Sequence, residues 1–196
     1  MNARDAVLGA VRHALGEAPR GHLSVSRDYT GRSLSHDRVA VFVERVTDYK
    51  ATVQAVAPTD VVAAITSTLA GRSVICPSDL PYAVAGSITD AGQSAVELDK
   101  IEAVVTTAAV GIAETGTIVL DHGPGQGRRA LTLVPDVHIC VVRADQIVAD
   151  VPDAVAVLDP RRPQTWISGP SATSDIELDR VEGVHGPRTL HVLLVG

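Results

Sequence analysis

The chain reads Ala103-Val104-Val105-Thr106-Thr107-Ala108-Ala109-Val110-Gly111-Ile112-Ala113, then Glu114-Thr115-Gly116, then Thr117-Ile118-Val119-Leu120-Asp121. Both apolar runs are rich in β-branched residues, which favour strands. The Thr115-Gly116 pair between them predicts a hairpin or tight bend, because glycine accepts the backbone conformations that such turns need. We therefore expect two neighbouring strands joined by this bend.

Other short Val-rich runs repeat this texture along the chain and alternate with helical patterns. A chain of 196 residues, 45% hydrophobic, is long enough to bury one core, and with 3% aromatic residues that core must be built from Val, Ala, Leu and Ile. Val-rich strands separated by helices favour an α/β fold with a buried parallel sheet. The further predicted strands are Thr52–Val56, Ser73–Cys76, Ala95–Leu98, Val137–Val142, Thr165–Ser168 and Leu190–Val195.

Helical periodicity marks four segments. These are residues 2–16 with a stop at Gly16, Asp37–Tyr49 with a cap at Ser35 or Asp37, Pro58–Leu69 with a cap at Thr59, and Val151–Val157. Residues 17–35 are rich in Gly, Ser and Arg and lack periodicity, which is typical of an extended arm. We therefore divide the chain into an N-terminal helical extension and arm (1–50) and an α/β domain (51–196).

Composition narrows the class of protein. The formal net charge of −6 argues against a nucleic-acid-binding surface, which is normally basic. The two cysteines, Cys76 and Cys140, each lie in an apolar run and are expected to be buried free thiols, and without a C-x-x-C pattern no iron–sulfur or zinc cysteine set is expected in this chain. The sequence shows no signal-peptide core and no apolar run near the ~20 residues needed to span a bilayer, which predicts a cytoplasmic protein.

A second distinctive stretch runs from Ile167 to Glu177, reading Ile-Ser-Gly-Pro-Ser-Ala-Thr-Ser-Asp-Ile-Glu. Ser174 and Glu177 fit a capping box at a helix start. Such a start is also suited to binding phosphate or carboxylate, and the hydroxyls of Ser168, Ser171 and Thr173 could add hydrogen bonds. Asp175 opposes an anion there unless its carboxylate binds a cation or the protein's own amides.

Four further residues are candidates for chemistry. Glu114, at the predicted bend, could be a general base, a nucleophile or an ion-pair partner of Arg128, whose guanidinium suits carboxylate or phosphate and which follows the glycine-rich loop 123–127. His138 enters a strand and is favoured as a structural residue, whereas His185 lies between small residues that allow close approach. The spacing matches no standard metal motif, and a triad of Ser171, His185 and Asp175 lacks a nucleophile elbow.

Several of these motifs together resemble one family. Ala113–Leu120, Leu133–Ile139, Ser168–Glu177 and Gly183–Pro187 occur in an order similar to that of the LUD-domain (lactate utilisation) family, and in particular its LutC/YkgG group. The resemblance is strong over residues 95–196 and weaker over the N-terminal segments. It implies a three-layer α/β/α fold similar to the NagB/RpiA/CoA-transferase-like superfamily.

The resemblance also implies a role in oxidising L-lactate to pyruvate. The chain would then act as the component without cofactor, beside LutA-like and LutB-like iron–sulfur proteins. The alternatives are an independent enzyme or binding protein for a phosphorylated or acyl ligand, and an assembly module without chemistry. The candidate catalytic residues are Glu114 and His185, and the candidate substrate-binding residues are Thr115, Gly116, Arg128, His138, Gly169, Ser171, Thr173 and Asp175.

Overall fold

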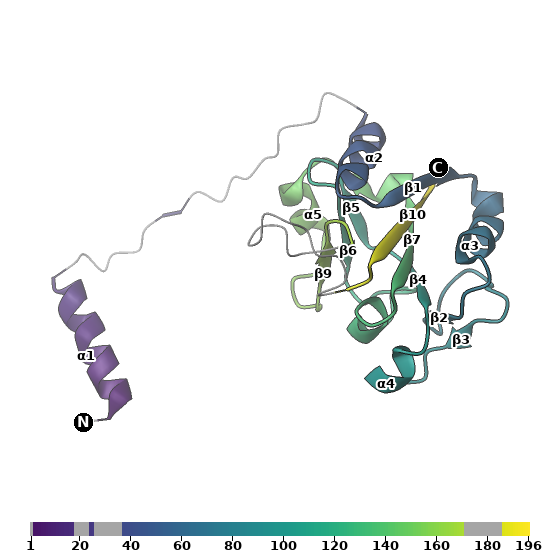
Figure 1. Ribbon diagram of the computed structural model, residues 1–196. Coiled ribbons are helices and arrows are strands. Elements are labelled where there is room, and N and C mark those ends of the chain that lie inside the picture. The colour runs from purple at the N-terminus through teal and green to yellow at the C-terminus, as the bar shows by residue number, and fades with distance from the viewer. Residues whose placement is uncertain (1, 18–23, 26–36, 171–185) are drawn as a thin grey trace.

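The computed structural model describes residues 2–17, 24–25, 37–170 and 186–196 (Figure 1). Their helices are α1 (Ala3–Leu15), α2 (Arg38–Asp48), α3 (Val61–Leu69), α4 (Ala95–Leu98) and α5 (Val151–Val157), with 3₁₀ turns η1 (Pro58–Asp60), η2 (Arg129–Thr132) and η3 (Ala144–Gln146). Their strands are β1 (Thr52–Val56), β2 (Val74–Cys76), β3 (Ile88–Thr89), β4 (Ala103–Thr107), β5 (Val110–Ile112), β6 (Thr117–Leu120), β7 (Val137–Arg143), β8 (Ile147–Val148), β9 (Thr165–Ile167) and β10 (Thr189–Val195).

A parallel sheet in the order β1-β10-β7-β4-β2-β3 forms the centre of the protein. Its inner strands β10, β7, β4 and β2 are largely apolar and buried, which fits a sheet covered on both faces by helices or a second sheet. On one face, Ile65 of α3 packs with Ile139 and Leu193. On the other, Phe42 of α2 packs with Val192. The α/β fold with flanking helices is thus confirmed.

A second sheet, in the order β8-β5-β6-β9, lies over the α2 face of the first. Strands β5 and β6 form the predicted hairpin, with Ile112 opposite Thr117 and a turn that contains Gly116. Strand β9 adds to β6 antiparallel, and β8 adds to β5 parallel. The sequence predicted the hairpin and β9 as separate features but not their union into one sheet.

Local capping signals account for the start of α2 and the end of α1, but not for the start of α3. Asp37 caps α2 by accepting a hydrogen bond from the Val39 N–H at 2.9 Å, and α1 ends at Gly16, whose φ is 47°. The prediction that Thr59 caps α3 is wrong, since its hydroxyl donates to the Asp60 carboxylate and the described start of α3 has no side-chain cap. No residue of α1 is buried.

The prediction of a strand at Ala95–Leu98 is also wrong. This segment is helix α4, and Ser94 and Glu97 form a complete capping box at its start, with the Ser94 N–H donating to Glu97 Oε2 at 2.8 Å. The S-x-x-E pattern was therefore the better signal, since a four-residue apolar run cannot by itself distinguish a strand from a short helix.

Burial of the two cysteines is confirmed. Both are free thiols in the core, Cys76 on β2 and Cys140 on β7. Burial raises the pKa of Cys140 to about 12, against the smaller effect of its hydrogen bond with Thr106.

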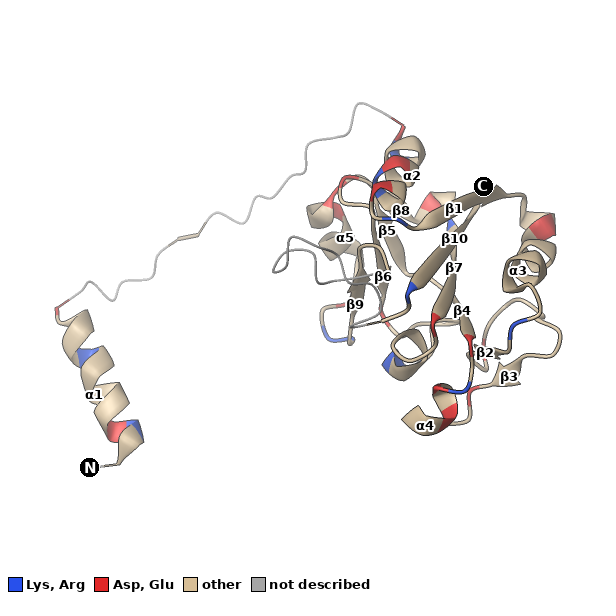
Figure 2. Cartoon of the chain, viewed as in Figure 1, with Lys and Arg blue, Asp and Glu red and all other residues tan. Residues whose placement is uncertain are grey.

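Among the described residues, no helix is long and apolar enough to cross a membrane. Figure 2 shows that acidic and basic residues are interspersed along the chain.

Candidate functional site

Three hydroxyl groups form a continuous row at the end of the second sheet. Thr115 Oγ1 lies 2.7 Å from Thr117 Oγ1, which lies 2.8 Å from Ser168 Oγ. The antiparallel pairing of β6 with β9, which sets Ile118 opposite Ile167, brings Thr117 beside Ser168. We call these three residues the hydroxyl row. Thr117, in the middle of the row, is buried, whereas Thr115 and Ser168 are partly exposed. Hydroxyls act as both donors and acceptors, so Thr115 and Ser168 are the members of the row that can hydrogen-bond a bound molecule.

Two glycines predicted to bind substrate flank the hydroxyl row and pack against the end of α2. Gly116 has a φ of 60°, and a Cβ there would lie 2.7 Å from the Arg45 backbone. Gly169 has a φ of 78°, and a Cβ there would lie 2.6 Å from the Tyr49 carbonyl oxygen. Both glycines therefore permit a close approach of backbones. A role in binding stays a prediction for each.

Glu114 lies at the turn of the hairpin, next to the hydroxyl row in sequence. Its side chain is exposed, while its backbone N–H donates to the Ala149 carbonyl at 3.0 Å. Its role as a catalytic residue stays a prediction.

Arg128 has a different partner from the one considered in the sequence. Its guanidinium binds both oxygens of Asp90 at 3.0–3.1 Å and donates to the Gln93 carbonyl at 2.7 Å. Burial acts to raise the pKa of Asp90, but hydrogen bonds from Arg128 and Gly92 outweigh it, so that the pKa is lowered. The carboxylate of the ion pair thus comes from Asp90, after β3, and not from Glu114.

The glycine-rich loop that precedes Arg128 packs over the end of β4. The Gly125 carbonyl accepts the Thr107 N–H at 2.9 Å, and the Thr107 hydroxyl donates to the Pro124 carbonyl at 2.8 Å. A Cβ on Gly127 would lie 2.7 Å from Leu131. The glycines thus serve close packing at the carboxyl edge of the central sheet.

His138 is buried within β7. Its Nε2 lies 2.8 Å from the Thr106 hydroxyl, and its side chain has almost no exposure. Burial, with a smaller effect from the nearby Arg129 charge, lowers the pKa of His138 to about 4. The imidazole is therefore neutral at pH 7. This geometry is that of a hydrogen-bonded core histidine, the structural role that the sequence favoured.

The remaining candidates, Ser171, Thr173, Asp175 and His185, lie outside the described residues, as does the predicted capping box of Ser174 and Glu177. Among the described candidates, the structure brings Thr115, Gly116 and Gly169 together. It places Arg128 and His138 in separate polar contacts. Thr117 was missed, because only the pairing of β6 with β9 reveals its position. No group of three or more His, Cys, Asp or Glu able to hold a metal occurs in the described part.

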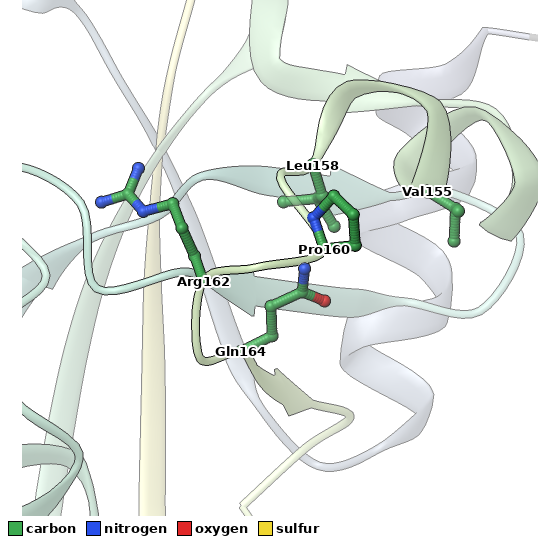
Figure 3. Close-up of a pocket in the computed structure, with 5 residues that line it drawn as sticks. All are labelled: Val155, Leu158, Pro160, Arg162 and Gln164. Atoms are coloured by element: carbon green, nitrogen blue, oxygen red, sulfur yellow. The ribbon is translucent and has the colours of Figure 1, made fainter.

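A cavity of 310 Å³ lies between α5 and the segment leading to β9 (Figure 3). Its lining residues are Val155, Leu158, Pro160, Arg162 and Gln164. Figure 3 shows the Arg162 guanidinium pointing away from Pro160 and Leu158, and this group forms an ion pair with Asp121 at 2.9 Å. The wall that remains is largely apolar.

Large apolar side chains of α5 and β9 are also exposed. Val155 and Val157 on α5 are 60% and 65% exposed, and Trp166 on the edge strand β9 is 40% exposed. We treat these exposed side chains as candidate points of contact with another molecule.

The fold and the hairpin motif define a class of protein. Residues 89–195 match the LUD domain. The chain is 50% identical over 165 residues to "Lactate utilization protein C" of Deinococcus radiodurans. The aligned region covers 79% of this chain and 78% of that protein. The chain belongs to the LUD-domain family, and its sequence places it with the LutC-like members.

Other relatives agree with this assignment. "Lactate utilization protein C" of Bacillus licheniformis is 34% identical over 91 residues, which span 42% of this chain and 38% of that protein. The crystal structure of a DUF162 family protein from Deinococcus radiodurans superimposes with a TM-score of 0.70 at 42% identity, over 81% of this chain and 96% of that one.

Proposed function

We propose that this protein serves lactate utilisation as the component without iron–sulfur clusters in a system that oxidises L-lactate to pyruvate. The 50% identity to a protein named "Lactate utilization protein C", over more than three quarters of both chains, carries the proposal. The proposal assigns hydrogen bonding of the lactate hydroxyl to Thr115 and Ser168, and the removal of its proton to Glu114 as general base.

The partners in this proposal are LutA-like and LutB-like iron–sulfur proteins. Cys76 and Cys140 are both buried, and burial raises the pKa of each thiol, so neither is available at the surface as a cluster ligand. The exposed apolar side chains of α5 and β9 supply a surface that a partner can cover. Both observations support a division of labour in which partners carry the electrons.

Growth tests the proposal directly. A strain that lacks the gene, and any paralogue, is expected to fail on L-lactate as sole carbon source and to grow normally on pyruvate. The intact gene should restore growth on lactate. Normal growth of the deletion strain on lactate would refute the proposal.

Complementation of the deletion strain with two variants then tests the exposed apolar side chains of α5 and the Glu114 carboxylate separately. A Val155→Asp, Val157→Asp double variant should fold but lose co-purification with the iron–sulfur partners. A Glu114→Gln variant should keep co-purification and lose lactate oxidation. If both variants restore growth fully, neither the apolar surface nor the Glu114 carboxylate has the role proposed for it.

A further inference from the structure

A second cavity lies at the carboxyl edge of the central sheet, away from the residues assigned above. Its volume is 390 Å³, within the roughly 300–1,000 Å³ typical of small-molecule sites. The residues that line it include Val61, Tyr82, Arg143, Asp145 and Val195. We call it the edge cavity.

The topology of the sheet explains why a hollow forms there. Strand β1 leads into α3, which covers one face, whereas β7 leads through η3 to β8 in the second sheet, which covers the other. Strand β10 lies between β1 and β7 and ends at Val195. Beyond the end of β10, the β1–α3 connection therefore leaves toward one face of the sheet and the β7–β8 connection toward the other. In open α/β sheets, ligands bind in the crevice formed where neighbouring connections leave in opposite directions.

The chemistry of the lining indicates which ligand fits. Val61 and Val195 provide an apolar floor, and Tyr82 packs beside them against the same core cluster. Arg143 supplies a cation at the rim and is held by Asp145, with Nε 2.9 Å from Oδ1, while the two side chains are 55% and 72% exposed. Exposed ion pairs of this kind contribute little stability, so an anion can displace Asp145 from Arg143.

We infer that the edge cavity binds a small organic phosphate, with the phosphate on Arg143 and a planar or apolar body against Tyr82. Guanidinium suits a phosphate because it offers two parallel N–H donors. Asp145 competes with the phosphate for the same guanidinium. Arg143 therefore favours phosphate binding, and Asp145 opposes it.

Calorimetric titration of the protein with adenosine monophosphate tests this site. Arg143→Gln should weaken binding about tenfold or more, since it removes charge-assisted hydrogen bonds. Asp145→Asn should strengthen binding, since it frees Arg143 and removes a repulsive carboxylate. Tyr82→Leu should weaken binding of the nucleotide but leave that of inorganic phosphate unchanged.

Arg161→Gln is the matched control. Arg161 forms an equivalent exposed pair with Asp159, its Nε 3.1 Å from Oδ1, and does not line the edge cavity. This variant should bind the nucleotide like the unmodified protein. The inference is overturned if no binding is measured at millimolar nucleotide, or if Arg143→Gln and Arg161→Gln change affinity equally. Neither result bears on growth with lactate, so the proposed function is tested separately.

Discussion

Acidification from pH 7 to pH 5 is expected to destabilise this protein through His138. The imidazole is buried against Thr106, and its pKa falls from 6.5 in the unfolded chain to about 4 in the folded protein. Between these two values the unfolded state binds more protons than the folded state. Stability is therefore present above pH 6.5 and is lost as the pH falls through this window.

The size of the effect follows from the two pKa values. A difference of about 2.5 pKa units corresponds to about 3 kcal/mol once the pH is below both values. Between pH 7 and pH 5 the linkage relation gives a loss of about 2 kcal/mol. This is a large part of the roughly 5–15 kcal/mol that stabilises a typical domain.

Urea unfolding at pH 7 and pH 5 measures this loss. The variant His138→Gln cannot titrate there but keeps an amide able to hydrogen-bond Thr106, so its loss between the two pH values should be smaller by about 2 kcal/mol. A small loss with the same sign should remain from His191, whose pKa is lowered by burial and by the Arg72 charge.

A control variant, His13→Gln, changes an exposed histidine of α1 and should behave like the unmodified protein. If the unmodified protein and His138→Gln lose the same free energy between pH 7 and pH 5, the imidazole is not the group whose burial makes folding sensitive to acid.

Two more perturbations test contacts of the candidate site by urea unfolding. Gly116→Ala should destabilise the protein by about 2 kcal/mol more than the control Gly92→Ala. Both substitutions place an alanine at a positive φ, but only the one at residue 116 puts a Cβ too close to Arg45. Equal losses of stability would contradict the close approach of Gly116 to α2. Arg128→Gln should cost about 2 kcal/mol by leaving Asp90 without its cation, and a cycle with Asp90→Asn should show strong coupling, whereas additive losses would mean that the pair contributes nothing.

On its own, the amino-acid sequence determined the features that depend only on residues close together in the chain. The β5–β6 hairpin, the Asp37 cap, the Gly16 stop and the buried cysteines all follow from local periodicity, turn chemistry or apolar surroundings. The exceptions, Ala95–Leu98 and the Thr59 cap, lie in short segments where two local patterns compete.

Tertiary structure alone decided which distant residues meet. Ser168 reaches Thr117 across 51 positions, Arg128 reaches Asp90 across 38, and His138 reaches Thr106 across 32. These contacts depend on which strands pair and in which register. That choice is made by burial of the whole sheet, to which any single local pattern contributes only a part.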